Sequence, residues 1–361
     1  MPSLIRINDG KDDDANEKLN TILRRLFQSG NLNFIFGSGA SMPAINIGGN
    51  IETQIQSHFD KGEDEKAYRL IHSFLTNLQR PNCWMVGNIP FPPIEGGADH
   101  AEKIESFVNT LKSYSDFIEI IERILNERKT NILPKQANIF TTNYDLFFEK
   151  ASEKFATIKF NDGFTRTPNL NGKNLFSSQN FFNSLYNNGN LYGYKVEIPT
   201  INLIKIHGSL TWKKEADSIH FNTQPIPEAV DETVISQIQD FNSKFAVILP
   251  QKGKFREAVI DRTFYDLLRL YANELDKENT LLIAFGFSFE DEHIYDITKR
   301  ALKNPTLRLM IFAFDEAAAK SFEAKFDGYS NVDIIAPADG TVIDFTKLNG
   351  ILTSLPGSED K

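Results

Sequence analysis

The chain has 361 residues, a formal net charge of −9, 41% hydrophobic residues and a single cysteine. The hydrophobic fraction predicts a globular protein with a sizeable core. The acidic balance argues against a general binder of the nucleic-acid backbone, which needs a basic face, although Lys205, Lys213 and Lys214 would suffice for a local basic patch. Cys83 alone can form neither an internal disulfide nor a cysteine zinc site. The sequence has no apolar run of about 18 residues and no signal-peptide pattern at its start, so we expect a cytoplasmic location.

Helix and strand patterns alternate along the chain. Residues 15–30 carry a helical apolar stripe that Gly30 ends. A strand at residues 33–36 comes next, and helical periodicity then dominates residues 51–128, with a Pro/Gly-rich break at 80–97. Further apolar strands are predicted at residues 137–143, 202–209, 244–250, 280–288, 306–315 and 332–337, and further helices at 144–151, 290–302 and 342–352.

Short, continuously apolar strands that alternate with helices are typical of a parallel sheet buried on both faces. We therefore predict an α/β fold, a doubly wound Rossmann-like parallel sheet with an inserted helical module. Residues 1–41 would begin the Rossmann core and residues 42–135 would form the inserted module. Residues 136–361 would complete the core, with an irregular insertion at about 161–193.

In such sheets, ligands bind outside the carboxyl ends of the strands, so functional side chains should directly follow strands. Four polar clusters have this placement. They are "GSGAS" at residues 37–41, "TTNYD" at 141–145, "HGSLTW" at 207–212 and "GFSFEDEH" at 286–293.

The first two clusters each allow two interpretations. Gly37 and Gly39 permit a close backbone approach to a pyrophosphate at the start of the following helix, but a plain strand-to-helix turn needs them as well. Met42 stands where a dinucleotide fingerprint expects its third glycine or alanine. Asn143 and Asp145 lie at the end of a strand, where they would serve chemistry or cap a helix.

The last two clusters also have structural alternatives. His207 suits a general base near neutral pH, although most single histidines are structural. Gly286 and Ser288 would approach a ribose or an adenine. The carboxylates at 290–292 fit the first turn of a helix, where its dipole favours them, and a metal site is the weaker interpretation.

The order of the clusters is more informative than any one of them. Gly-x-Gly-Ala-Ser, Thr-x-Asn-x-Asp, His-Gly and Gly-x-Ser, each after a strand, resemble the sirtuin family. The similarity is closest to its bacterial sirtuin-like branch, whose members are NAD-cleaving defence proteins. The resemblance covers about residues 33–41, 138–150, 203–212 and 281–294, and it leaves the intervening helical region unmatched.

The resemblance implies a role for each matched residue. Asn143 would contact the nicotinamide ribose and place the attacking water, and Asp145 would lie near the nicotinamide amide. His207 would act as a base or hydrogen-bond partner on the ribose hydroxyls. The NAD pyrophosphate would be held by Gly37, Ser38, Gly39, Ala40 and Ser41, the adenosine side would be lined by Gly286 and Ser288, and the remaining cofactor contacts would come from Thr142, Gly208 and Phe287.

Two departures from the sirtuin deacylases indicate the reaction. Those enzymes carry a four-cysteine zinc module and a Pro-Asp-Phe-Arg stretch after the glycine motif, whereas this chain has one cysteine and continues "MPAINIGGN". The NAD half of the site is thus retained without the peptide half, so water is the expected nucleophile and no zinc is expected. The resemblance implies an NAD+ glycohydrolase that depletes NAD in antiphage defence by abortive infection.

Uncontrolled NAD depletion would kill the host cell, so the activity must be gated. We expect gating by assembly, as a homo-oligomer or with a HerA-type hexameric ATPase partner. We expect no membrane association and no direct nucleic-acid binding. Two other functions stay open. One is an NAD or ADP-ribose sensor without turnover, and the other is a nuclease subunit that holds Mg²⁺ at residues 290–292.

Overall fold

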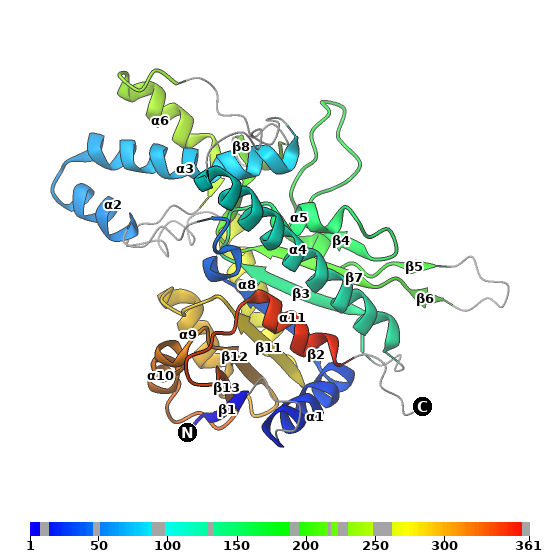
Figure 1. Ribbon diagram of the computed structural model, residues 1–361. Coiled ribbons are helices and arrows are strands. Elements are labelled where there is room, and N and C mark those ends of the chain that lie inside the picture. Colours follow the sequence, from blue (N-terminus) through cyan, green and yellow to red (C-terminus); the bar gives the residue numbers. More distant parts are fainter. Residues whose placement is uncertain are drawn as a thin grey trace.

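Strands from distant parts of the sequence pair into one parallel sheet. The computed structural model describes residues 1–7, 14–45, 51–87, 98–128, 133–187, 195–215, 218–222, 230–247 and 262–355. The sheet order is β1-β13-β12-β11-β2-β3-β7-β4, and every neighbouring pair is parallel (Figure 1). The strands are β1 Ser3–Ile7, β2 Asn31–Phe36, β3 Gln136–Thr141, β4 Lys159–Asn161, β7 Thr200–Lys205, β11 Thr280–Phe285, β12 Arg308–Phe312 and β13 Val332–Pro337. The predicted doubly wound α/β fold is confirmed.

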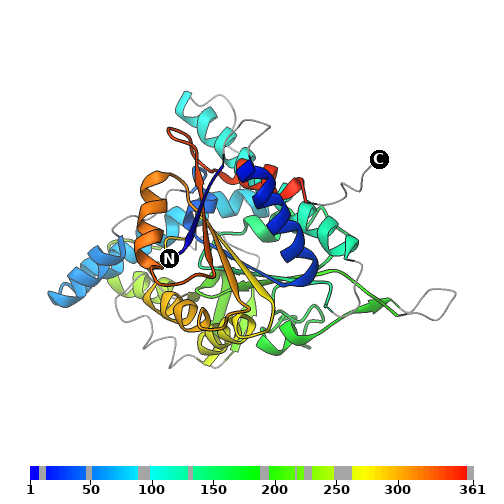
Figure 2. The ribbon, with the colours of Figure 1, turned by 90° about the horizontal axis from the view of Figure 1, so that it is seen from below.

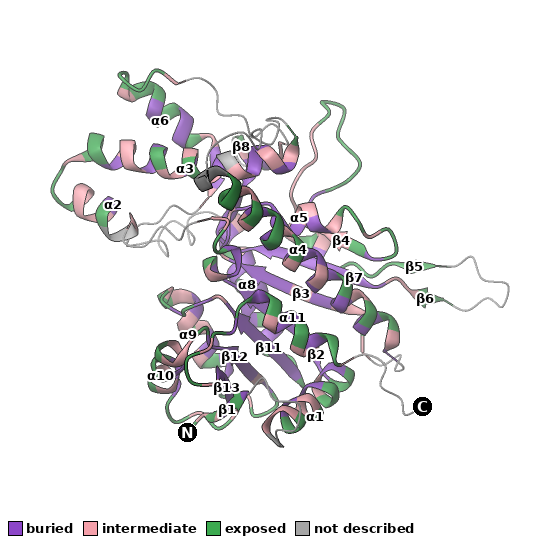
Figure 3. Cartoon of the chain, viewed as in Figure 1, coloured by how far each residue is buried: buried purple, intermediate pink, exposed green. Residues whose placement is uncertain are grey.

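Both faces of the sheet are covered by helices. Phe34 and Phe36 of β2 belong to the apolar cluster on one face, and Ile35 belongs to the cluster on the other, as the two-residue period of a strand requires. One face packs against α1 (Asp14–Ser29), α4 (Ala98–Glu127), α5 (Phe147–Ser152) and α11 (Phe345–Thr353), and the other packs against α8 (Arg262–Leu275), α9 (Glu292–Ala301) and α10 (Glu316–Lys325). Figure 2 shows α1 and α11 on the side of the sheet opposite α8, and Figure 3 shows the buried strands between helices with exposed outer faces.

A row of asparagines crosses four adjacent strands of the sheet. Asn33, Asn138, Asn202 and Asn161 lie directly opposite one another in β2, β3, β7 and β4. The Nδ2 of Asn138, Asn202 and Asn161 each donates to the Oδ1 of the asparagine named before it in this order, at 2.8, 2.8 and 2.9 Å. A register slip of one residue would leave these groups unpaired in the interior, which is costly. The row therefore fixes the register of this half of the sheet.

A smaller module lies beyond the carboxyl edge of the sheet. It consists of α2 (Ile51–Asp60), α3 (Asp64–Val86), α6 (Ile235–Ser243) and a three-stranded antiparallel sheet in the order β10 (Phe245–Val247), β8 (Gly208–Glu215), β9 (Ser218–Phe221). All of these elements except β9 contribute to one apolar cluster, with Tyr144 packed against it. Helix α4 does not join this cluster, because its buried side chains pack against the main sheet. The domain boundaries predicted at residues 41 and 135 stay a prediction.

Some local predictions differ from the structure. The strand predicted at 244–250 is β10, which pairs antiparallel with β8 outside the main sheet; residues 248–250 lie outside the described ranges. The break predicted from residue 80 begins later, because α3 continues through Pro81. Cys83 and Met85 in this last part of the helix are buried. Helix α3 ends at Gly87, which has φ 78°. Strand β1 was not predicted from the sequence. None of the helices within the described ranges is long and apolar enough to cross a membrane.

Candidate active site

The four polar clusters meet at one edge of the sheet. Strands β11, β2, β3 and β7 are consecutive neighbours, and the carboxyl ends of parallel strands lie at the same edge. The chain leaves β2 toward β3 on one side, and β11 later pairs on the other side of β2. This reversal of strand order is the position at which doubly wound sheets bind ligands.

The glycines hold two of the loops in backbone contact. Gly37 N–H donates to the carbonyl of Phe285 at 3.2 Å, and Gly39 N–H donates to that of Gly286 at 3.0 Å. A Cβ on Gly37 would lie 2.4 Å from the oxygen of Gly286, and a Cβ on Gly286 would lie 2.4 Å from the nitrogen of Ala40. Gly286 also has φ 61°, a left-handed conformation that favours glycine. The glycine pattern is therefore required by the contact between the loops after β2 and β11.

The turn after β2 differs from the predicted helix start. Residues Ser38–Ser41 form a single 3-10 turn, in which Ala40 N–H donates to the carbonyl of Gly37 at 3.0 Å. The next described helix, α2, begins only at Ile51. Ser38 is exposed on this turn, whereas Ala40 and Ser41 are buried. Of the predicted pyrophosphate contacts in this turn, only Ser38 has an exposed side chain.

The side-chain amide of Asn143 is held by two hydrogen bonds. Its Nδ2 donates to the carbonyl of Gly37 at 3.0 Å and to Ser41 Oγ at 3.1 Å. The loop itself is fixed because Asn143 N–H donates to Thr141 Oγ1, which in turn donates to the carbonyl of Phe36. Since both amide hydrogens are used, the orientation of the amide is determined. With both hydrogens of Nδ2 engaged, Oδ1 is the hydrogen-bond acceptor that this side chain offers.

Ser41 joins three side chains in a buried network. Its hydroxyl donates to Asp145 Oδ2 at 2.7 Å and accepts from Asn143. Because its one hydrogen goes to Asp145, the hydroxyl of Tyr114, 2.8 Å away, must donate to it. Burial raises the pKa of Asp145, against the opposing effects of Lys205 and the Ser41 hydroxyl. Burial and the nearby Asp145 likewise raise the pKa of Tyr114. The Ser41 and Asp145 side chains are thus engaged by the protein and position Asn143.

A buried lysine connects the same loop to the next strand. Lys205, 2% exposed at the end of β7, pairs with Glu149 Oε1 of α5 at 2.7 Å. Its amine also donates to the main-chain oxygen of Asp145 and, at 3.3 Å, to Ser209 Oγ. Burial raises the pKa of Glu149 despite this partner. Lys205 therefore does not contribute to the local basic patch that its position in the sequence suggested.

His207 follows β7 and faces a carboxylate from another loop. Its Nε2 lies 3.0 Å from Asp291 Oδ2, and the two side chains are 9% and 10% exposed. The neighbouring Gly208 has φ 83°, and a Cβ there would lie 2.1 Å from the oxygen of Ala246, so this position also requires glycine. The imidazole ring lies beside the Tyr144 ring, with centroids 6.4 Å apart.

The remaining predicted contacts lie around this edge. Thr142 is half-buried and donates its N–H to the carbonyl of Phe36 at 3.3 Å, and Phe287 is buried against Phe289. Ser288 is exposed. Among the carboxylates at 290–292, Asp291 caps the start of α9, which agrees with the predicted place of these residues at the beginning of a helix. Within the described residues, no three His, Cys, Asp or Glu side chains converge to hold a metal.

Three residues of this network were not predicted as members of the site. Tyr114 belongs to a helix whose periodicity marks it only as core. The sequence places Asp291 in the first turn of a helix, where the helix dipole alone accounts for a carboxylate. Lys205 carried a usable signal, because a charged residue inside the apolar strand "NLIKI" is expected to be buried only with a partner.

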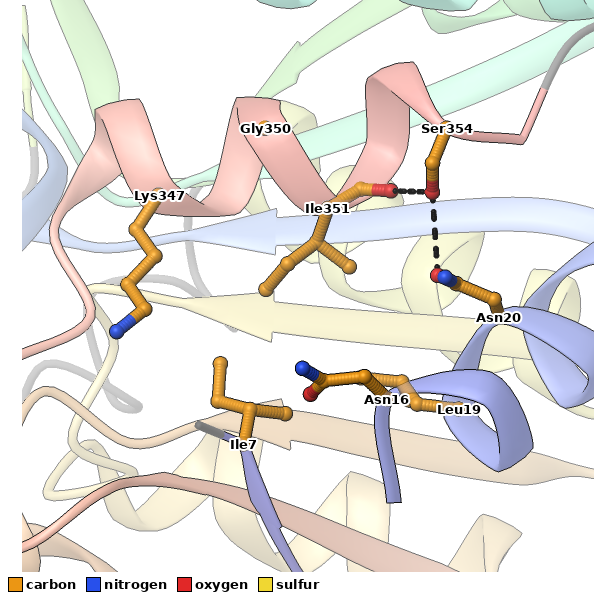
Figure 4. Close-up of a pocket in the computed structure, with 8 residues that line it drawn as sticks. All are labelled: Ile7, Asn16, Leu19, Asn20, Lys347, Gly350, Ile351 and Ser354. Carbon is orange, nitrogen blue, oxygen red and sulfur yellow. Dashed lines mark hydrogen bonds between the residues drawn. The ribbon is translucent and has the colours of Figure 1, made fainter. Parts of the chain in front are cut away.

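A separate pocket lies between α1 and α11, on one face of the sheet (Figure 4). Its volume is about 300 Å³, and it is lined by Ile7, Asn16, Leu19, Asn20, Lys347, Gly350, Ile351 and Ser354. Ser354 Oγ donates to Asn20 Oδ1 across it at 3.1 Å. None of its lining residues belongs to the four clusters, so it is distinct from the candidate site.

The fold and this edge define a Rossmann-like α/β protein with a candidate ligand site at the carboxyl ends of β2, β3, β7 and β11. Residues 137–335, more than half of the chain, match the SIR2-like domain family, and the chain belongs to that family. SIR2-like domains use NAD as a substrate, so membership indicates an NAD-related activity. The matched residues contain the clusters after β3, β7 and β11. The glycine loop at 37–41 lies outside the match and contacts the clusters after β11 and β3 through its hydrogen bonds with Phe285, Gly286 and Asn143. No curated protein matches the chain.

Proposed function

We propose that this chain hydrolyses the bond between nicotinamide and ribose in NAD+, releasing nicotinamide and ADP-ribose. The observation that carries the proposal is the anchored amide of Asn143 at the reversal point of the sheet. The SIR2-like family supplies the expectation of NAD as the substrate. The two loops in contact through Gly37, Gly39 and Gly286 form the adjacent surface, where we place the phosphates.

In this reaction the oxygen of a water molecule bonds to the ribose carbon while the carbon–nitrogen bond breaks, and its electron pair leaves with nicotinamide. Asn143 Oδ1 would accept a hydrogen bond from the water or a ribose hydroxyl, which is a contribution by positioning. His207 would engage the ribose hydroxyls and assist removal of the proton. A general base is typically worth about 100- to 10,000-fold in rate. Water is the proposed nucleophile because the sequence lacks the peptide-binding stretch of the deacylases.

The first expected result is nicotinamide release by the purified protein that depends on Asn143. Asn143→Ala should lower the rate at least about 100-fold, because it removes the positioned acceptor. The matched control is Asn331→Ala. Asn331 also donates its amide to main-chain oxygens, of Leu302 and Leu307, but it precedes β13 at the opposite edge of the sheet. The control should retain the wild-type rate.

Two outcomes would contradict the assignment. Wild-type turnover by Asn143→Ala would exclude Asn143 as the positioning group. Saturable NAD binding without nicotinamide release, with and without a partner ATPase, would exclude hydrolysis and favour the sensor function.

We further propose that the activity serves antiphage defence by abortive infection and is gated by assembly, with copies of itself or with a HerA-type hexameric ATPase. The argument is that unregulated NAD loss would kill the host. Copurification from a strain that carries the neighbouring genes should yield an oligomer or a complex, measured by light scattering. A chain that is monomeric and fully active alone would contradict gating by assembly.

A further inference from the structure

The carboxylate of Asp291 performs two separate tasks. Its Oδ1 accepts hydrogen bonds from the N–H groups of His293 and Ile294, at 3.1 and 3.2 Å, and so caps α9. Its Oδ2 lies 3.0 Å from His207 Nε2. One oxygen thus anchors the side chain to its own helix while the other faces the imidazole ring.

The position of Asp291 is fixed independently of His207. The turn from β11 to α9 passes through Gly286 at φ 61° and Phe289 at φ 57°. Phe289 is 2% exposed and packs against Phe322 and Phe326 of the helical layer. A left-handed conformation at a bulky residue is unusual, and here the buried aromatic contacts hold it. The carboxylate is therefore presented to His207 by a rigid turn.

We propose that Asp291 is a positioning residue for His207, and this inference rests on the proposed function. A carboxylate only accepts, so the facing Nε2 carries the proton and the neutral ring has Nδ1 as its basic nitrogen. During hydrolysis Nδ1 takes the proton lost from the reacting hydroxyl. Asp291 remains ionised and stabilises the imidazolium that forms. Asp291 acts through His207 and makes no contact with the substrate.

Two substitutions separate this role from the helix cap. Asparagine and serine both cap helices about as well as aspartate. Asp291→Asn keeps the cap through Oδ1 but turns an N–H donor toward Nε2, which forces the proton onto Nδ1. Asp291→Ser keeps the cap and removes the carboxylate that faces the ring. The control is Asp344→Asn, because Asp344 caps α11 through the N–H of Lys347 at 2.8 Å, away from the site.

We expect Asp291→Asn to lower kcat at least about 100-fold, since the same exchange in a catalytic His–Asp pair costs about 10⁴-fold. KM should stay within about threefold, because a residue that acts on the base alone leaves ground-state binding unchanged. The kcat of Asp291→Ser should fall less, because the His207 ring in this variant still samples the correct tautomer. Asp344→Asn should match the wild type, and all variants should keep the wild-type melting temperature.

Imidazole ¹⁵N spectra of the full chain test the arrangement without any NAD. The chain has six histidines, and the signal lost in His207→Gln identifies the relevant ring. We expect the Nε2–H tautomer in the wild type and the Nδ1–H tautomer in Asp291→Asn. An unchanged tautomer, or wild-type kcat in Asp291→Asn, would overturn the inference. Absence of NAD hydrolysis in the wild type would overturn the proposed function alone, because the tautomer would still report the pair.

Discussion

Asn143→Asp is expected to abolish NAD cleavage and to destabilise the fold more than Asn143→Ala does. The carboxylate has nearly the same shape as the amide, but it cannot donate. It would place an oxygen against the carbonyl of Gly37, 3.0 Å from the present nitrogen, and another negative charge beside Asp145. Alanine loses the same two hydrogen bonds without adding a charge. An unsatisfied buried polar group costs about 1–3 kcal/mol, so we expect about 2–4 kcal/mol for the aspartate variant.

Urea unfolding followed by circular dichroism measures this difference, with nicotinamide release in parallel. A buried carboxylate without a donor should take up a proton, so the stability of Asn143→Asp should recover as the pH falls. The control, Asn331→Asp, faces main-chain oxygens at the other edge of the sheet. It should be destabilised in a similar way while its NAD cleavage survives at temperatures where it remains folded. Equal stability of Asn143→Asp and the wild type would show that the amide is not anchored as described.

The fold was largely predictable because its signals are local. Strands such as "NFIF" and "TLLIAF" are apolar on both faces and lie between amphipathic helices, which is the pattern of a buried parallel sheet. That inference also placed the four clusters at one edge, since strand direction alone determines where the carboxyl ends lie. Strand β1 and the antiparallel pairing of β10 escaped prediction because short strands depend on their partners more than on their own residues.

The network around Asn143 could not be predicted, because its members meet only in space. Ser41 and Tyr114 are 73 positions apart, and Ser41 and Asp145 are 104 apart. The sequence assigns Ser41 to a glycine-rich turn and Tyr114 to the apolar face of a helix. Nothing in either pattern indicates that their hydroxyls meet. The same holds for the asparagine row across β2, β3, β7 and β4, whose members are isolated polar residues in apolar strands.

Lys205→Met is expected to be the most destabilising single change outside the apolar core. The substitution removes the cation that pairs with Glu149. The other oxygen of this carboxylate, Oε2, is already buried without a hydrogen-bond partner among the described residues. The substitution also removes the donor to the main-chain oxygen of Asp145. Removal of one member of a buried ion pair costs about 3–5 kcal/mol, because the remaining charge is left uncompensated. The loop that carries Asn143 would lose this one of its links to β7, so NAD cleavage should fall as well.

A matched pair on the same helix serves as the control. Lys150 of α5 contacts Glu153 at 2.6 Å on the surface, and an exposed pair contributes at most about 1 kcal/mol, so Lys150→Met should be nearly silent. The double variant Lys205→Met/Glu149→Gln should recover part of the loss, since it removes the uncompensated charge along with its partner. Equal losses for Lys205→Met and Lys150→Met in urea unfolding would contradict the buried pair.

The pH dependence of the Lys205→Met defect follows from the same pair. Burial raises the pKa of Glu149 and of Asp145, while Lys205 opposes both shifts. Without Lys205 the pKa of each carboxyl in the folded state rises further above its value in the unfolded chain. The folded state then binds more protons than the unfolded state, so the stability of the variant increases as the pH falls through these folded-state pKa values. The gap between the variant and the wild type should therefore be largest at neutral to alkaline pH and should narrow on acidification. A gap that stays the same across this pH range would mean that Lys205 stabilises the loop by packing rather than by charge.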